Sequence, residues 1–369
     1  MIIMRQKIKV FLKNAIKYFF IYLNYTFWKI FYFSKNKLIK KENIKETLII
    51  NLSFIGDLLA TTPLIDVLVK ENFSVSVCVL PSMKCLFEKN KNVRRIIVFE
   101  KEKILSQIKG KYDLAILIYP RNREIEEILK KSEIPYKISF CPYLPFSCLS
   151  IYNLLVIPML DRVHKVRENL SLISSLVDLE KRDITPLNNS TKFFLSKKEI
   201  SDFQKKFKKI KHYVVVSPGS RGKIRLKEKL IDERVLSEIS DYIIENYGYR
   251  IVLTGMPNEK EICDRIIFFS KYKNRFINLA GNSSIRELVF LLKNSRLLIS
   301  IDSGAVHLAA TQKTKIIDVI KESQIRVWAP WLNKENFKLI IAKNDDFSTI
   351  NFENLRIAVD DILGDNIHY

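Results

Sequence analysis

The sequence predicts an α/β protein of two domains, each a doubly wound and mostly parallel sheet with helices on both faces. Three observations predict it. The chain has 369 residues, which is more than one hydrophobic core usually serves. From residue 46 onward, short apolar runs alternate with amphipathic stretches, as in parallel strands joined by crossover helices. Glycine is scarce, and five of the nine glycines follow predicted strands.

Residues 1–45 form a separate basic and aromatic segment. They hold eleven Lys or Arg residues and one acid, a net charge of +10. The longest uncharged stretch in the middle of the segment, 18–28, has eleven residues, too few to span a bilayer, and no small-residue cleavage site follows it. Lysines interleaved with aromatic rings favour a helix lying on an anionic membrane surface. A helix packed on the protein or a partner, and a single-span anchor, are the alternatives.

The first α/β domain is expected over residues 46–186. A helix is expected within it at 163–179, and a Pro- and Asn-containing stretch at its end suits a linker. Its apolar runs predict strands at 47–53, 74–80, 94–99, 113–119 and 136–140.

The second domain is expected over residues 190–350, followed by a C-terminal helix at 351–369. Its apolar runs predict strands at 213–217, 249–254, 276–280, 297–301 and 315–320. Ligands of open α/β sheets bind at the carboxyl ends of the strands, where glycine lets them approach the backbone closely. A binding cleft is therefore predicted from the glycines that follow strands, which are Gly56, Gly219, Gly255, Gly281 and Gly304.

Composition argues against several classes of function. Of the formal net charge of +22, the +12 outside residues 1–45 is spread through helical stretches, which does not suit a dedicated nucleic-acid binder. The five cysteines form no CxxC pair and fit reduced thiols of the cytosol. No GxGxxG follows the first strand, and no GxxxxGK[ST] or HExxH occurs. Hydride transfer, P-loop hydrolysis and zinc catalysis are therefore not indicated.

The stretch NLSFIGDLLATTPLIDVL, residues 51–68, leads from a strand through Gly56 into a helix that opens with Asp57. An Asp in a first helical turn can simply complement the helix dipole, worth about 0.3–1 kcal/mol. Alternatively, its carboxylate faces a cleft and acts as a general base toward a substrate hydroxyl.

The stretch VVVSPGSRGKIRLKEKL, residues 214–230, ends a strand with Ser217, Gly219 and Ser220 and continues with a cluster of cations. Hydroxyls, free amides and Lys or Arg side chains together make a phosphate site. A solvated basic loop is the alternative.

Two further stretches place polar residues after strands. In LTGMPNEKE, residues 253–261, Glu259 could bind ribose hydroxyls or could simply begin a helix. In ISIDSGAVHLAAT, residues 299–311, Ser303 and Gly304 would present a hydroxyl and amides at a helix N-terminus, a ready anion site. His307 lies on the same helical side as Gly304, and a hydrogen-bonded structural histidine is the alternative to a catalytic one.

Taken together and in this order, the four stretches resemble the family 9 glycosyltransferases, which include the lipopolysaccharide heptosyltransferases. The similarity runs from about residue 46 to 330, and its most specific pieces are NLSFIGDLLATTPLI, VHKVRENLSLI, SPGS, LTGMPNE and LAGNSSIRELVFLLKNSRLLISIDSGAVHLAA. The resemblance implies a GT-B fold: two Rossmann-like domains with an interdomain cleft, the first binding mainly the acceptor and the second a nucleotide-sugar.

The resemblance also implies the reaction. This is inverting transfer of a heptose-like sugar from a donor such as ADP-heptose to a lipopolysaccharide core or another lipid-linked saccharide. No metal or other cofactor and no nucleic-acid partner are implied. Together with the basic N-terminal segment, the resemblance predicts a cytoplasmic enzyme, peripheral on the inner face of the cytoplasmic membrane.

The resemblance implies a role for particular residues. Asp57 matches the proposed general base, and Glu259 matches a donor-binding acid at the nucleoside. Positions around the donor diphosphate are matched by Ser220, Asp302, Ser303 and Gly304, and positioning residues by Gly56, Gly219 and His307.

Two regions depart from the family pattern. Where the family has a Lys-Arg-Trp-Pro-like segment this chain reads LKEKLIDER, so Lys229 is the best match for a phosphate-binding cation, with Lys227 and Lys223 as rivals. After HLAA the chain reads TQKTKIIDVIKES instead of a Gly- and Pro-containing turn. These departures leave open a catalytically inactive nucleotide-sugar-binding or scaffold protein of the same fold. A membrane-associated nucleic-acid binder is a third class.

Overall fold

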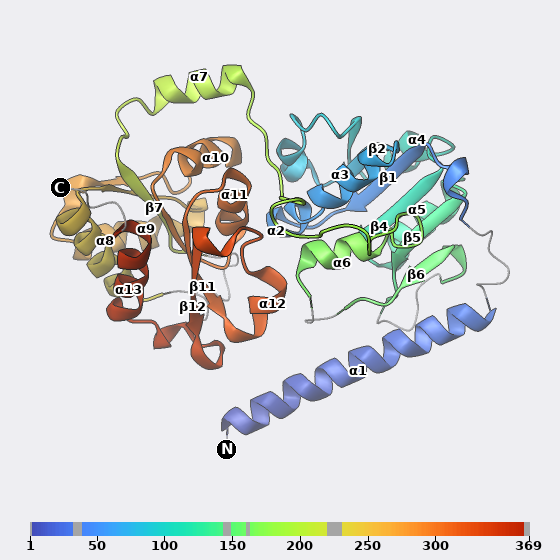
Figure 1. Cartoon of the computed structure of the whole chain (residues 1–369), viewed down its shortest axis with the longest axis horizontal. Helices are drawn as coiled ribbons and strands as arrows, with labels where there is room; N and C mark the ends of the chain where they lie inside the picture. Colours follow the sequence, from blue (N-terminus) through green and yellow to red (C-terminus); the bar gives the residue numbers. More distant parts are fainter. Residues whose placement is uncertain (1, 32–38, 143–148, 160–162, 220–230, 365–369) are drawn as a thin grey trace. The chain divides into compact units, whose positions relative to one another are not determined.

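The computed structural model describes residues 2–31, 39–142, 149–159, 163–219 and 231–364 (Figure 1). The chain divides into two compact units, residues 1–184 and 185–369. Each unit has its own parallel sheet.

The first unit is built on a six-stranded sheet of order β3-β2-β1-β4-β5-β6, and all of its strand pairs are parallel. Its strands are β1 (Glu46–Asn51), β2 (Ser74–Val79), β3 (Arg95–Val98), β4 (Leu114–Tyr119), β5 (Tyr136–Phe140) and β6 (Leu154–Val156). Its helices are α1 (Ile2–Phe31), α2 (Ile55–Leu59), α3 (Thr62–Lys70), α4 (Ile104–Ile108), α5 (Arg123–Lys131) and α6 (Lys165–Ser171).

The second unit repeats this plan with the order β12-β11-β10-β7-β8-β9, again all parallel. Its strands are β7 (Tyr213–Ser217), β8 (Arg250–Leu253), β9 (Phe276–Asn278), β10 (Leu298–Ile301), β11 (Ile316–Lys321) and β12 (Phe337–Ala342). Its helices are α7 (Lys197–Lys206), α8 (Glu233–Tyr247), α9 (Lys260–Phe269), α10 (Ile285–Asn294), α11 (Gly304–Gln312), α12 (Ile325–Trp328) and α13 (Phe352–Leu363).

Both sheets have the same strand order when each is counted from its own first strand, 3-2-1-4-5-6. In such a doubly wound sheet the order reverses between the first and fourth strands, and ligands bind at the carboxyl ends of the strands beside that point. These strands are β1 and β4 in the first unit and β7 and β10 in the second. The loops that follow them are therefore where function is expected.

The inner strands of both sheets are buried on both faces, as expected for parallel strands covered by helices. In the second unit, α8, α9 and α13 share one hydrophobic core with the sheet, and α10 and α11 pack together on its other side (Figure 1). In the first unit, α4 and α5 share a core with β1 and β4. None of the four described cysteines, Cys78, Cys85, Cys141 and Cys263, forms a disulfide.

The helix α1 packs on the first unit. Ile21 and Trp28 are buried in the core of that unit. The Trp28 indole Nε1 donates a hydrogen bond of 3.1 Å to the Tyr152 carbonyl, and Asn24 Nδ2 donates one of 2.9 Å to the Pro142 carbonyl. The alternative of a helix packed on its own protein is therefore present in the structure. No helix of the described residues is long and apolar enough to cross a membrane.

Every predicted strand is found, but two strands were missed and one helix is wrong in length. The missed strands, β6 and β12, lie at sheet edges, where short length or partial exposure weakens the apolar signal. The helix expected at 163–179 ends at Ser171. Ser171 and Ser174 donate their hydroxyls to backbone carbonyls three residues earlier, and such bonds compete with a continuing helix.

Candidate functional site

Asp57 lies in the first turn of α2, directly after β1, and is half-buried. The turn is held by Asn51, the last residue of β1, whose side-chain amide donates to Thr61 Oγ1 at 3.0 Å and to the Asp57 carbonyl at 3.4 Å. Thr61 Oγ1 also donates to that carbonyl at 2.9 Å. The backbone of Asp57 is thus fixed by a buried amide. Sequence reasoning missed Asn51, although a polar residue at the end of a buried strand was its signal.

Cations gather near the carboxyl ends of β4 and β5. The Arg121 guanidinium lies 5.6 Å from the centre of the Phe140 ring, and Lys165 Nζ lies 5.9 Å from it. Phe140 ends β5 and is buried, while Lys165 begins α6. Tyr119, at the end of β4, is half exposed. Lys165 is also ion-paired with Glu168, so Arg121 is the cation whose positive charge could attract an anionic ligand beside this aromatic surface.

In the second unit, hydroxyl groups join the ends of β7 and β10. Ser300 Oγ donates to the Ser217 carbonyl at 3.1 Å and lies 3.1 Å from Ser303 Oγ. Ser303 is the N-cap of α11, and its hydroxyl accepts the backbone N–H of Ala305 at 3.3 Å. The start of α11, at Gly304, is thus tied to the neighbouring strand. Backbone N–H groups at such a start favour anions.

Asp302 and His307 form a pair at the same end of β10. His307 Nε2 lies 3.7 Å from Asp302 Oδ1, and both side chains are mostly buried. The imidazole also meets the Trp328 ring edge-on, with ring centres 5.6 Å apart. His307 is thus held by a carboxylate and an aromatic ring, which suits the expected positioning role and equally a structural one.

Asp318 is a buried acid that sequence reasoning missed. It is fully buried in β11, in register with Ser300 on β10, and neither carboxyl oxygen has a hydrogen-bond partner among the described residues. Burial, and then the nearby charge of Asp302, raise the pKa of Asp318 well above its usual value. The protonated, uncharged form of Asp318 is therefore favoured over the carboxylate. Its signal was a carboxylate in the middle of the apolar run IIDVI.

Glu259 is held between the ends of β7 and β8. Its side chain is buried, and Oε2 accepts the backbone N–H of Met256 at 2.6 Å. A Cβ atom at Gly219 or Gly255 would overlap the Glu259 side chain, so a larger residue at either position would force Glu259 to shift. Burial raises the pKa of Glu259, and the Met256 hydrogen bond opposes that shift. Gly219 and Gly255 thus make room for a carboxyl group at the edge of the sheet.

The expected phosphate site also includes a serine hydroxyl and a cluster of lysines that follow β7 in the sequence. Ser220 and Lys229, with the rival residues Lys223 and Lys227, lie outside the described residues. The described residues hold no group of three His, Cys, Asp or Glu side chains that could bind a metal ion.

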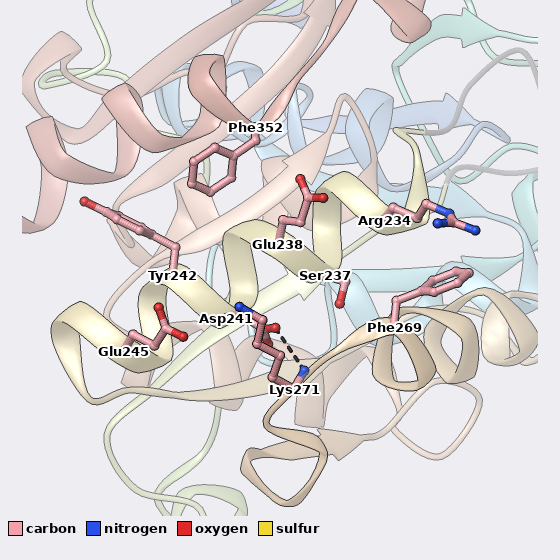
Figure 2. A pocket seen from close by; sticks show the side chains of 9 residues that line it. All are labelled: Arg234, Ser237, Glu238, Asp241, Tyr242, Glu245, Phe269, Lys271 and Phe352. Atoms are coloured by element: carbon pink, nitrogen blue, oxygen red, sulfur yellow. Dashed lines mark hydrogen bonds between the residues drawn. The ribbon is translucent and has the colours of Figure 1, made fainter.

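A cavity of about 430 Å³ lies over α8 in the second unit, away from these residues (Figure 2). None of the expected site residues lines it. Asp241 on its floor accepts hydrogen bonds from Ser270 Oγ and the Lys271 backbone, so that carboxylate serves the fold. Its lining is formed by Arg234, Ser237, Glu238, Asp241, Tyr242, Glu245, Phe269, Lys271 and Phe352.

Comparison with known proteins gives consistent results. Residues 152–352 match the model of glycosyltransferase family 9 (heptosyltransferase). A lipopolysaccharide heptosyltransferase 3 of Escherichia coli K12 is 31% identical over 121 residues, which are 32% of this chain. The matched part spans only 34% of that relative.

Two solved structures share the fold. A family 9 glycosyl transferase from Veillonella parvula has a TM-score of 0.74 at 18% identity, over 89% of this chain and 99% of that one. The Escherichia coli ADP-heptose lipopolysaccharide heptosyltransferase II has a TM-score of 0.73 at 17% identity, over 87% of this chain and 99% of that one. The predicted fold class, two Rossmann-like units of the GT-B type, is confirmed.

Proposed function

The chain belongs to glycosyltransferase family 9, and we propose that it transfers a heptose-like sugar from a nucleoside-diphosphate donor, such as ADP-heptose, to a saccharide acceptor. One observation carries the proposal. The described residues to which a site role is assigned follow β1, β7, β8 and β10, at or beside the switch points of the two sheets. Those are the positions where doubly wound sheets bind ligands.

The donor side of the proposal rests on the second unit. The start of α11, with the Ser303 hydroxyl and the Gly304 backbone, would bind the diphosphate, and Glu259 would accept hydrogen bonds from the ribose. The departing diphosphate gains negative charge, which helix amides and the expected cation Lys229 would stabilise without a metal ion. ADP-heptose is proposed because one of the solved structures with the same fold is the Escherichia coli ADP-heptose lipopolysaccharide heptosyltransferase II.

The acceptor side rests on the first unit. The Asp57 carboxylate would take the proton of the acceptor hydroxyl as the hydroxyl oxygen attacks the anomeric carbon. The bond from that carbon to the diphosphate oxygen breaks on the opposite side, and the electron pair leaves with the diphosphate. The configuration at the anomeric carbon is therefore inverted.

We propose an anionic, lipid-linked acceptor of the lipopolysaccharide-core type, met at the inner face of the cytoplasmic membrane. Arg121 beside Phe140 supplies positive charge at the carboxyl edge of the first sheet, and Lys165 lies on the same ring but is ion-paired with Glu168. Phosphate and carboxylate groups of an acidic saccharide would be attracted there. The named relative acts on lipopolysaccharide, in keeping with this substrate class.

The test is a mass-spectrometric assay of the full chain with nucleotide-sugars and acidic lipid-linked or core saccharides. Transfer of the sugar with release of nucleoside diphosphate is expected, with ADP-heptose the preferred donor. Binding of the nucleotide-sugar without transfer to any acceptor would favour an inactive nucleotide-sugar-binding protein.

A further inference from the structure

The helix α1 has a buried face and, separate from it, an exposed apolar face. The buried face holds Ile21, Asn24 and Trp28, which pack against the first unit. A second set of apolar residues recurs every three or four positions, so that its members share one side of the helix. That side is turned roughly 135° from the buried face, at 3.6 residues per turn. We call this second set the outer stripe; it consists of Leu12, Ile16, Phe19, Leu23, Phe27 and Ile30.

The outer stripe is a continuous apolar surface of a kind that soluble proteins rarely expose to water. Its six side chains keep between 46% and 63% of their surface accessible. From Leu12 to Ile30 the stripe is about 27 Å long, at 1.5 Å per residue. Single exposed apolar residues are ordinary, but a continuous apolar stripe of this length marks an interaction surface. Something other than water is therefore expected to cover it.

Charge decides which partner covers the stripe. The segment that contains α1, residues 1–45, has a net charge of +10, from eleven Lys or Arg residues and one acid. Pairing two copies through the stripe would bring two such segments together, which repulsion opposes. A bilayer with anionic lipids instead supplies both an apolar layer for the stripe and negative charge for the lysines. Exposed Tyr22, beside the stripe, suits the boundary between water and lipid.

We propose that α1 lies in the plane of an anionic membrane surface, with the outer stripe toward the acyl chains, and holds the first unit in one orientation. Two hydrogen bonds and the burial of Ile21 and Trp28 fix the helix to that unit. The helix is therefore rigidly attached to the first unit and is not a flexible tether. The inference deepens the proposed function and rests on it only for the place of the acceptor.

The first experiment measures flotation of the full chain with vesicles of phosphatidylcholine alone or mixed with phosphatidylglycerol. Binding is expected only to the mixed vesicles. The variant Phe19→Glu/Leu23→Glu should lose at least tenfold in binding while its thermal unfolding is unchanged, because both side chains are exposed. The matched control is Phe268→Glu/Ile357→Glu, which charges two exposed apolar residues of the second unit and should bind normally.

Equal binding by the outer-stripe variant and the wild type would overturn the proposal. The proposal would also be overturned if the wild type does not bind vesicles and instead forms a dimer that the outer-stripe variant does not form. Rigid attachment is tested by Trp28→Ala, which should leave vesicle binding in place but broaden the distance distribution between a spin label on the first unit and the lipid surface. An unchanged distance distribution would contradict the inference that α1 is rigidly attached to the first unit.

The second experiment separates this inference from the proposed function. Transfer is measured to an acceptor embedded in vesicles and to a water-soluble saccharide without lipid. The outer-stripe variant should lose at least tenfold on the embedded acceptor and keep its rate on the soluble one. If the wild type transfers to neither acceptor, the proposed function fails, and the flotation result still decides whether α1 binds membranes.

Discussion

The two units share one topology but carry different side chains at the carboxyl ends of the strands where the strand order reverses. In the first unit that edge holds Asp57 on a turn fixed by Asn51, with Arg121 and Lys165 nearby. In the second it holds the capped start of α11 and the buried acid Glu259. We propose that the same fold offers a proton acceptor in one unit and an anion site in the other. Proposed roles follow from side chains at the strand ends, not from the fold.

The largest effect is expected from Asp57→Asn. If the first unit supplies the base, transfer should fall by a factor of about 10²–10⁴, because an amide cannot take the hydroxyl proton. Donor binding, assigned to the second unit, should stay unchanged in calorimetry. The matched control is Asp202→Asn, an exposed acid on α7. Wild-type turnover by Asp57→Asn would remove the division of labour between the units.

The next prediction concerns the unfolding free energy and involves Asp318, a residue of the second unit. The pKa of Asp318 is higher in the folded state than in the unfolded state. The contribution of this group to the unfolding free energy is therefore complete below the unfolded-state pKa, near 4, and is lost as the pH rises through the folded-state pKa. Asp318→Asn removes the titration. The unfolding free energy of the variant relative to wild type should therefore rise from pH 5 to pH 7, by at most about 1.4 kcal/mol per pH unit. Urea unfolding at both pH values measures this, and parallel curves would contradict it.

A smaller effect is expected from Gly219→Ala. The new Cβ would overlap Glu259 and displace its carboxyl group from the edge of the sheet. Donor affinity should fall about tenfold, or about 1.4 kcal/mol, with little change in the affinity for the acceptor. Gly364→Ala is the control, since a Cβ there meets nothing within 4 Å. Unaltered donor binding by Gly219→Ala would separate Glu259 from the donor site.

The smallest effect is expected from Ser303→Ala. Loss of the N-cap of α11 should cost about 1 kcal/mol of unfolding free energy and should also weaken donor binding severalfold. The control is Ser196→Ala, which removes a comparable N-cap from α7. Because Ser196 is not one of the residues that follow the strands, this variant should lose a similar unfolding free energy with no change in donor affinity. Identical donor affinity in both variants would leave Ser303 a purely structural cap.

Local patterns in the sequence were sufficient for the fold class, for all the strands except two at sheet edges, and for the strand-end positions of Asp57, Glu259 and Ser303. These follow from periodicity and from glycine placement, which act over a few neighbouring residues. The roles of these residues remain proposals. The same patterns made the helix at 163–179 too long, because serine hydroxyls that bond back to the backbone are not visible in apolar spacing.

Contacts between distant segments decided the rest. Glu259 lies against Gly219, 40 positions earlier in the chain, and Asp318 lies beside Asp302, so neither environment could be read from nearby residues. Apolar residues occur nearly all round α1, and only the packing of Ile21 and Trp28 shows which face the protein covers and which it leaves exposed. Periodicity states that a helix has an apolar side, but burial depends on what the rest of the chain brings to it.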